Sequence, residues 1–163
     1  MEKQNEATPE PGGHTDRDFM LDAIAEGRLA GEQGEVPVGA VLVANGRIVS
    51  RAHNLRETTG DPLAHAELLA LQASARALGS WRLDGATLYV TVEPCPMCAG
   101  ALVQARVSRL VYGVRDFKAG AAGTLFDIVR DERLNHRLEV TDGILEEECR
   151  NLMRDFFQQR RSR

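Results

Sequence analysis

The fold is decided by the stretch Thr87-Leu88-Tyr89-Val90-Thr91-Val92-Glu93-Pro94-Cys95-Pro96-Met97-Cys98-Ala99-Gly100, which predicts a strand that leads directly into a helix. The first half of the stretch is mostly β-branched or aromatic, a composition typical of a buried strand. Pro96 suits the first position of a helix because no backbone N–H is needed there, and we expect the helix to run on to Arg106. Cys95 and Cys98 should therefore lie at the start of this helix, where both sulfur atoms can reach one point.

These two thiols are suited to binding a borderline metal ion. The positive end of a helix dipole lowers the pKa of a nearby thiol, so thiolates form more easily at a helix start. Zinc is the metal that such a pair binds most often. The same spacing also fits a thioredoxin-like redox pair, but that interpretation leaves His65 and Glu67 without a role.

A second motif, Ala64-His65-Ala66-Glu67, is expected at the start of another helix. Asp61-Pro62 is a turn signal, and the Ala- and Leu-rich run that follows predicts a helix over Ala64–Leu78, ended by the next glycine. In the middle of a helix, side chains two positions apart point to different sides. In the first turn, His65 and Glu67 can instead both lean over the helix end and converge on one site.

Together the two motifs supply the ligands of a catalytic zinc site. His65, Cys95 and Cys98 provide one imidazole and two thiolates, which is one ligand short of a tetrahedron. A structural zinc site fills the fourth position with protein, whereas a catalytic site leaves it to water. We therefore predict one Zn²⁺ bound by these three residues, with Glu67 as an unbound catalytic carboxylate that moves protons beside the metal-activated water.

Length and composition predict one ordinary globular domain. The chain has 163 residues, of which 43% are hydrophobic and 27% charged, and it is long enough for a real core. No apolar run has membrane-spanning length, and the N-terminus lacks the apolar stretch of a secretory signal. Residues 1–15 are polar with several Pro and Gly, so we expect a disordered tail before a single domain over 16–163. Three cysteines, two of them assigned to metal, argue against disulfides and favour the cytoplasm.

The charge of the chain argues against a general nucleic-acid binder. Its net charge is −4 and its pI is 5.6, whereas such binders are usually basic. Basic residues are nevertheless concentrated near the C-terminus, where Asp155 is the only acid after Arg150. A local patch can bind phosphates on a molecule that is acidic overall. The patch consists of Arg150, Arg154, Arg160, Arg161 and Arg163.

The rest of the chain predicts an α/β protein with a hairpin and at least one parallel crossover. Asn45-Gly46 is a strong hairpin signal between two strand-like runs. The helix that carries the cysteines is long enough to connect two parallel strands. A first helix is expected to start at Thr15 and Asp18 and to end near Gly31 or Gly34. The other expected elements are strands over Val38–Val43, Arg47–Ala52, Arg109–Val114 and Leu138–Val140, a loop over Arg115–Gly123 and a short helix over Thr124–Arg130.

A final helix is expected after Thr141-Asp142-Gly143. Its apolar residues recur in steps of three and four, which predicts one buried stripe. Cys149 and Phe156 lie on that stripe and are expected in the core. Trp81, much earlier in the chain, is also expected to be a packing residue.

The spacing His-x-Glu followed by Pro-Cys-x-x-Cys is a signature of zinc-dependent nucleobase deaminases, and this sequence resembles that superfamily. More narrowly, it resembles the bacterial tRNA-specific adenosine deaminases, which edit the wobble base of the anticodon. The resemblance covers Asp18–Arg161, nearly the whole chain. It is carried by Val36-Pro37-Val38-Gly39-Ala40-Val41-Leu42-Val43, Ala64–Glu67, Ala86–Gly100 and Gly113–Gly123, and by Phe156-Phe157 and Arg160-Arg161.

This resemblance implies a fold, a reaction and an assembly. The fold is the three-layer cytidine-deaminase-like α/β fold, in which helices cover both faces of a mixed five-stranded sheet. The reaction is the hydrolytic deamination of adenosine to inosine, with release of ammonia, at the wobble position of a tRNA anticodon, mainly that of an arginine tRNA. The enzyme is implied to be a cytoplasmic homodimer with one zinc ion per subunit and the anticodon stem-loop as its partner.

The resemblance also implies substrate-binding residues. Asn54 falls where the family places its base-reading asparagine, although the residues alone favour a turn or cap asparagine. The loop that contains Asp116 and Lys118 lines the substrate groove in the family. Phe117 beside them could stack on a base or lie in a dimer interface. The C-terminal end adds three expected RNA contacts, Phe157, Arg160 and Arg161.

Two other functions are compatible with the same motifs. The zinc constellation alone also fits deaminases of free cytosine, cytidine or guanine, or of a pyrimidine intermediate of riboflavin synthesis. The basic C-terminal end favours a macromolecular substrate over these. A structural zinc module without catalysis would need a fourth protein ligand, for which His53, His136 and Cys149 are the candidates.

Overall fold

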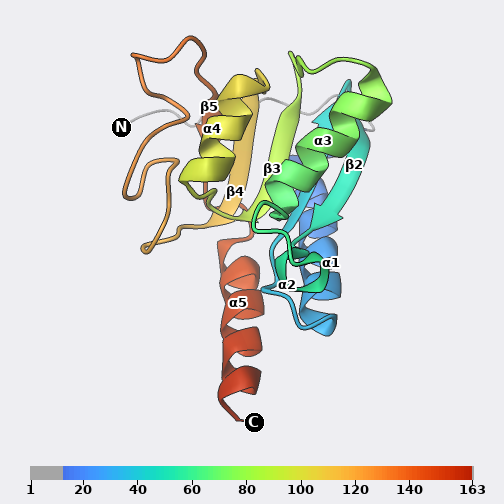
Figure 1. Cartoon of the computed structure of the whole chain (residues 1–163), viewed down its shortest axis with the longest axis vertical. Coiled ribbons are helices and arrows are strands. Elements are labelled where there is room, and N and C mark those ends of the chain that lie inside the picture. The colour runs from blue at the N-terminus through green and yellow to red at the C-terminus, as the bar shows by residue number, and fades with distance from the viewer. Residues whose placement is uncertain (1–12, 163) are drawn as a thin grey trace.

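The computed structural model describes residues 13–162, and these residues form a mixed five-stranded sheet (Figure 1). Neighbouring strands follow the order β2-β1-β3-β4-β5. The pairs β2–β1 and β1–β3 are antiparallel, whereas β3–β4 and β4–β5 are parallel. The strands are β1 (Gly39–Ala44), β2 (Arg47–His53), β3 (Thr87–Val92), β4 (Arg109–Val114) and β5 (Glu139–Thr141).

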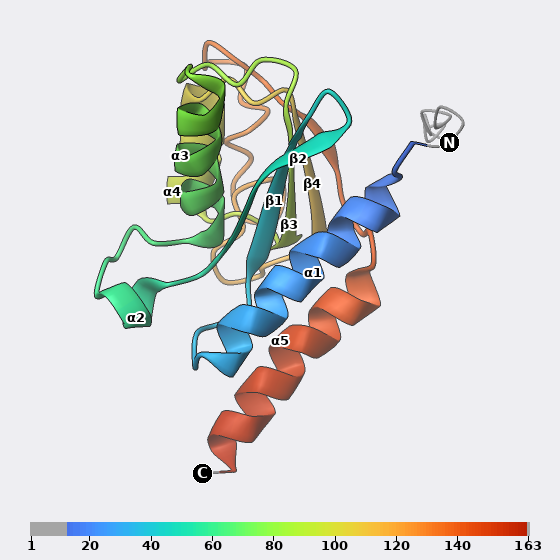
Figure 2. The same cartoon turned by 90° about the vertical axis from the view of Figure 1, so that its right-hand side faces the viewer.

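Helices cover both faces of the sheet, so the molecule has three layers (Figure 2). On one face lie α3 (Ala66–Leu78) and α4 (Pro96–Gln104), and on the other lie α1 (Asp16–Glu32) and α5 (Glu146–Arg161). Each face has its own apolar core. Leu42, Leu88 and Leu110 point toward α3 and α4, while Val41, Tyr89 and Val111 point toward α1 and α5. This alternation is the period-two pattern of strands buried on both sides, and it confirms the predicted three-layer α/β fold.

Local signals in the sequence explain where several elements begin and end. Thr15 caps α1, since its hydroxyl accepts from the N–H of Asp18 while the Asp18 carboxylate accepts from the N–H of Thr15. Asn45 and Gly46 both have positive φ in the β1–β2 turn, as the hairpin signal requires. The left-handed Gly79 ends α3 at the predicted residue.

The strand directions bring the ends of three strands to one edge of the sheet. β2 and β3 are both antiparallel to β1, and β3 is parallel to β4, so all three point the same way. The segments that follow β2, β3 and β4 therefore leave from the same edge. The segment after β2 contains a short helix, α2 (Arg56–Thr59), before α3 begins, and the segment after β3 begins α4. We call this edge of the sheet, from which the segments after β2, β3 and β4 leave, the catalytic edge.

Two predictions about local structure were wrong. Residues 124–130 form turns and an isolated bridge between Ala122 and Asp127 instead of a helix. The N–H groups of Leu125 and Phe126 donate to the carbonyl of Gly120, and that of Ile128 donates to the carbonyl of Ala121, so this segment folds back on the preceding loop instead of forming helical hydrogen bonds. Trp81 is not a packing residue, because 62% of it is exposed in the connection between α3 and β3.

The final helix is buried only at its start. Leu145 and Cys149 belong to the core on the α1 side, whereas Phe156 is half-buried and Phe157 is 40% exposed. The C-terminal half of α5 continues past the sheet beside α1 (Figures 1 and 2), so its stripe meets one helix rather than a closed core. Cys149 is a core residue as predicted, and Phe156 is not.

Two other expectations concern the chain as a whole. The predicted tail, residues 1–15, lies outside the described residues except for the last three, which lead into α1. Within residues 13–162, no helix is both long enough and apolar enough to cross a membrane.

Candidate active site

The two predicted metal-binding motifs meet at the catalytic edge. His65 immediately precedes α3, Cys95 immediately precedes α4, and Cys98 lies in the first turn of α4. The Nδ1 atom of His65 is 3.6 Å from the Sγ atom of Cys95 and 3.4 Å from that of Cys98. The three ligand atoms all lie within 4.8 Å of one another.

These distances fit a tetrahedral metal ion. A nitrogen and a sulfur bound to one zinc ion lie about 3.5 Å apart, given Zn–N and Zn–S bonds of about 2.0 and 2.3 Å. The hydrogen bond between the thiols lowers the pKa of Cys95 to about 5 and raises the pKa of Cys98. Without a cation, only one of the two sulfurs is readily deprotonated. A bound metal ion would stabilise both as thiolates. The nitrogen and two sulfurs form a donor set typical of zinc.

The candidates for a fourth protein ligand are engaged elsewhere. His53 contacts Glu26 at 2.8 Å, the Nε2 atom of His136 lies 2.6 Å from the carbonyl oxygen of Val107, and Cys149 is in the core on the other face of the sheet. In the described part of the chain, the cluster at the catalytic edge has three members. This ligand set matches an open catalytic site rather than a closed structural one.

Glu67 lies beside the three ligands but outside their cluster. It sits in the first turn of α3, is only 4% exposed, and borders the same cavity of about 240 Å³ as His65 and Cys95. Burial raises the pKa of this carboxyl group. A carboxyl group in this place can accept a proton and return it to a molecule bound in the cavity.

Asn54 and Asp116 also line the cavity, and the side chain of each forms hydrogen bonds with nearby backbone groups. The Asn54 amide donates to the carbonyl of Val36 at 3.4 Å and accepts from the N–H of Arg56 at 3.2 Å. Asp116 accepts from the N–H groups of Lys118 and Ala119, at 2.9 and 3.2 Å. Of the turn or cap role that the residues alone favoured for Asn54, the turn contact is present, in a residue that also lines the cavity.

The other predicted RNA contacts lie outside the cavity. Lys118 and Phe117 are at the exposed tip of the loop after β4, and Phe117 is 76% exposed. Phe157, Arg160 and Arg161 are on the projecting half of α5. The Arg160 guanidinium lies 5.0 Å from the ring of Phe156, and Arg161 donates to the carbonyl of Phe157.

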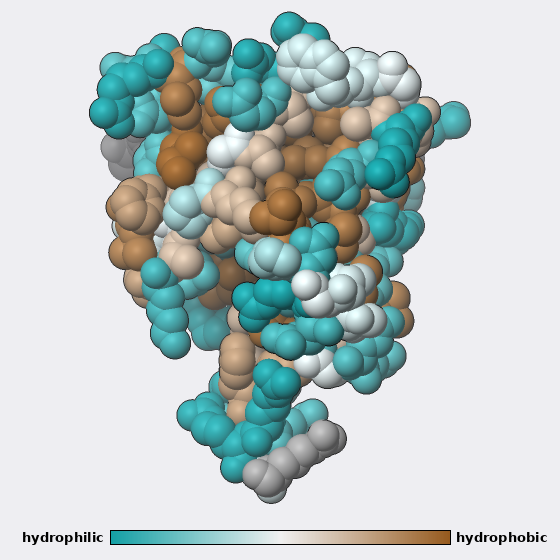
Figure 3. Space-filling view, in the orientation of Figure 1, coloured by the Kyte–Doolittle hydropathy of each residue, from teal (hydrophilic) through white to brown (hydrophobic). Residues whose placement is uncertain are grey.

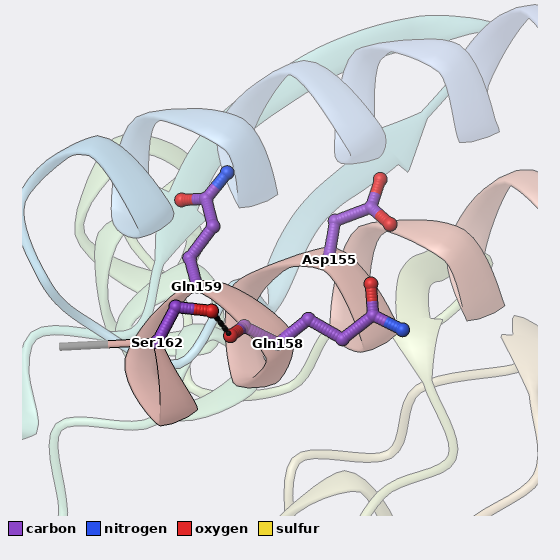
Figure 4. Close-up of a pocket in the computed structure, with 4 residues that line it drawn as sticks. All are labelled: Asp155, Gln158, Gln159 and Ser162. Carbon is purple, nitrogen blue, oxygen red and sulfur yellow. Dashed lines mark hydrogen bonds between the residues drawn. The ribbon is translucent and has the colours of Figure 1, made fainter.

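A second hollow lies on the same half of α5, lined by Asp155, Gln158, Gln159 and Ser162 (Figure 4). The Ser162 hydroxyl donates to the carbonyl of Gln158 at 3.0 Å. The hollow offers two amides, one hydroxyl and one carboxylate, and none of the predicted site residues. Its side chains provide no metal-ligand cluster.

Two buried carboxylates at the catalytic edge were not predicted. Glu35 is fully buried and accepts from the N–H groups of Glu57 and Thr58, at 2.8 and 3.3 Å, at the start of α2. Glu93 is 3% exposed and binds the loop after β4. Both pair with backbone groups far along the chain, so the only available signal was a charged residue next to a strand expected to be buried.

Comparison with known proteins gives consistent results. Residues 14–161 match the family described as MafB19-like deaminase. The chain is 54% identical over 145 residues to a tRNA-specific adenosine deaminase of Bacillus subtilis, covering 89% of this chain and 90% of that protein. A structure from studies of A-to-I editing by tRNA:A34 deaminases is 43% identical, with a TM-score of 0.80, and covers 82% of this chain and 97% of that one. A Bacillus subtilis guanine deaminase is 30% identical, with a TM-score of 0.62, and covers 92% and 96%.

We expect Glu35→Gln to loosen the short helix that carries Arg56 beside the cavity. An amide accepts fewer hydrogen bonds than a carboxylate and brings its own N–H groups toward the backbone donors. The change should destabilise the protein by about 1–3 kcal/mol and accelerate amide exchange at Glu57 and Thr58. Urea unfolding and hydrogen exchange measure these effects. Glu57→Gln, on the exposed side of the same helix, is the matched control, and equal exchange in both variants would contradict the anchoring role of Glu35.

Proposed function

The chain belongs to the tRNA-specific adenosine deaminases, and on this basis we propose that it converts the wobble adenosine of a bacterial arginine tRNA to inosine. Its general activity, the deamination of adenosine in tRNA, follows from the family. The observation that carries the proposal is the meeting of His65, Cys95 and Cys98 beside Glu67 in one cavity. The arginine tRNA comes from the resemblance of the sequence to the bacterial enzymes.

We propose that His65, Cys95 and Cys98 hold one Zn²⁺ per subunit. The separation of their ligand atoms and the nitrogen–sulfur donor set support this assignment. When bound there, zinc acts as a Lewis acid that lowers the pKa of water from 15.7 to about 7, which provides the nucleophile for hydrolysis.

Glu67 is the proposed proton carrier of the reaction. Its carboxylate takes a proton from the attacking water and transfers it to the ring nitrogen next to the reacting carbon. It then takes the remaining proton of the added hydroxyl group and passes it to the exocyclic amino group, which leaves as ammonia. Three features support this role: Glu67 is buried, it borders the cavity, and it is not one of the clustered ligands. A carboxyl group whose pKa is raised by burial can act as an acid and as a base near neutral pH.

The RNA would be held by residues in and around the cavity. Asn54 is the proposed reader of the base edge, Asp116 lines the cavity with it, and Lys118 is the proposed RNA contact on the exposed loop just outside the cavity. Phe157, Arg160 and Arg161 on the projecting end of α5 offer a ring and two positive charges to the anticodon stem-loop, on a chain whose net charge is −4. An anticodon base is already partly unstacked, so flipping it into the cavity costs at most a few kcal/mol.

We also propose that residues 16–163 form one zinc deaminase domain that works as a homodimer in the cytoplasm. The view in Figure 3 has brown apolar surface over the side of the molecule where α3 and α4 lie. Leu68 and Leu69 on α3 and Ala101 on α4 are only partly buried. An apolar outer face of this kind suits a contact between two copies. The free thiols of all three cysteines suit a reducing compartment.

The assembly is tested by light scattering of the purified protein. We expect a mass of about twice 17.9 kDa, because a second copy would cover the apolar face of α3 and α4. Ala101→Arg should give the monomer, since it places a charge at the proposed contact. Leu21→Arg, on an exposed position of α1, is the control and should leave the mass unchanged. A monomeric wild type would contradict the proposal.

The substrate is tested with a set of purified compounds. We expect the protein to release ammonia from an anticodon stem-loop of arginine tRNA with adenosine at the wobble position and to produce inosine there. Free cytosine, cytidine and guanine should react at least about a hundredfold more slowly, because they lack the loop contacts proposed for Lys118 and α5. Faster turnover of guanine than of the stem-loop would favour the alternative suggested by the likeness to guanine deaminase.

The role of Glu67 is tested by Glu67→Ala. We expect turnover of the stem-loop to fall by at least about a thousandfold, because no other side chain in the proposed mechanism transfers the protons. Metal analysis should still find about one zinc ion per chain, and thermal unfolding should stay cooperative. His65→Ala is the comparison variant, in which zinc content and turnover should be lost together. Near-native deamination by Glu67→Ala would refute the mechanism.

A further inference from the structure

Glu93 is a buried carboxylate at the active site that takes no part in the proposed chemistry. It lies immediately after β3, two residues before Cys95, and is only 3% exposed. It is not a member of the cluster of ligand atoms. A buried carboxylate must be hydrogen-bonded to be tolerated, so its partners indicate what it holds.

The hydrogen-bond partners of this carboxylate lie in one loop, residues 116–124. Its Oε1 atom accepts from the N–H of Asp116 at 3.1 Å and from the hydroxyl of Thr124. Its Oε2 atom accepts from the N–H groups of Ala122 at 2.9 Å and Thr124 at 3.1 Å. The carboxylate thus binds both ends of a loop that leaves the neighbouring parallel strand.

The loop is fitted closely around this carboxylate. A Cβ atom added to Gly120 would lie 2.6 Å from the carboxyl carbon of Glu93 and 2.4 Å from the carbonyl oxygen of Asp116. Separations this short do not occur between real side chains, so the loop can pass over Glu93 only with glycine at this position. The N–H of Ala121 also donates to the carbonyl of Pro94 at 2.8 Å, which adds a backbone contact to the same attachment.

We propose that Glu93 is a positioning residue that holds loop 116–124 as a preformed wall of the substrate cavity. Asp116 and Ala119 of this loop line the cavity together with Asn54 and His65, and Lys118 lies between them in sequence. The inference rests on the proposed function, since it assigns the wall to RNA binding. With the wall already ordered, the substrate does not pay the entropic cost of ordering it on binding.

The proposal is tested from both sides of the contact, with Glu93→Gln and Thr124→Val. Kinetics on the stem-loop, zinc content and amide hydrogen exchange are measured for each. We expect KM to rise about tenfold, the change that loss of one hydrogen bond to a charged group can produce, while kcat changes much less. The amides of Asp116, Ala122 and Thr124 should exchange faster in Glu93→Gln, and each chain should keep about one zinc ion.

Two further variants separate positioning from general stability. Thr124→Ser keeps the hydroxyl, so its KM for the stem-loop should stay much closer to that of the wild type than the KM of Thr124→Val. Glu132→Gln changes an exposed carboxylate outside the loop and should behave like the wild type. The KM of the double variant Glu93→Gln/Thr124→Val should be little higher than that of the more impaired single variant, because both substitutions remove the same contact.

Other results would overturn the inference. Unchanged KM and unchanged loop exchange in Thr124→Val would show that the contact does not order the wall. Loss of zinc together with kcat in that variant would assign the contact to the metal site instead. Thr124→Val removes only one hydroxyl, so it decides the question even where Glu93→Gln does not fold. A wild type that does not deaminate the stem-loop would refute the proposed function alone, since the exchange data still judge whether Glu93 holds the loop.

Discussion

The parallel pairing of β3 with β4 is the interaction on which the site depends. Because the two strands run the same way, the helix that joins them must start and the next loop must leave at one edge of the sheet. Cys95 and Cys98 stand at that helix start, and Asp116 stands in that loop. The hairpin places the end of β2 at the same edge, and the chain passes from there to His65. Residues up to about fifty positions apart in sequence are thereby assembled without any long irregular segment.

Three buried carboxyl groups are the second feature that organises the catalytic edge. Glu35, Glu67 and Glu93 are all under 9% exposed, and each borders or supports the cavity. Glu35 and Glu93 accept hydrogen bonds from backbone N–H groups, and such bonds offset the cost of burying a carboxylate. The third, Glu67, lines the cavity and is the carboxyl group that we propose acts on a bound molecule. The buried Glu35 and Glu93 thus hold segments next to the cavity through backbone N–H groups, and burial raises the pKa of Glu67.

Much of the fold and the centre of the site could be predicted because their signals are local. The alternation in residues 87–92, the hairpin at Asn45-Gly46 and the cysteines around Pro96 each depend on neighbours in sequence. The contacts of Glu35 and Glu93 could not be predicted, since they join residues about twenty to thirty positions apart. Residues 124–130 differ for another reason, because their N–H groups donate to the carbonyls of Gly120 and Ala121, and this turn pattern has no periodic signal in the sequence. The exposed end of α5 follows from the length of the helix relative to the sheet, which periodicity does not report.

The exposed Trp81 has a practical consequence for anyone who studies this protein in solution. It is the only tryptophan in the chain, and it lies just beyond the end of α3 that is farthest from His65. A helix of 13 residues separates the two by about 20 Å. The fluorescence of this indole will therefore report the solvent around a turn far from the cavity. Binding of RNA or metal at the opposite end of α3 should leave the emission nearly unchanged.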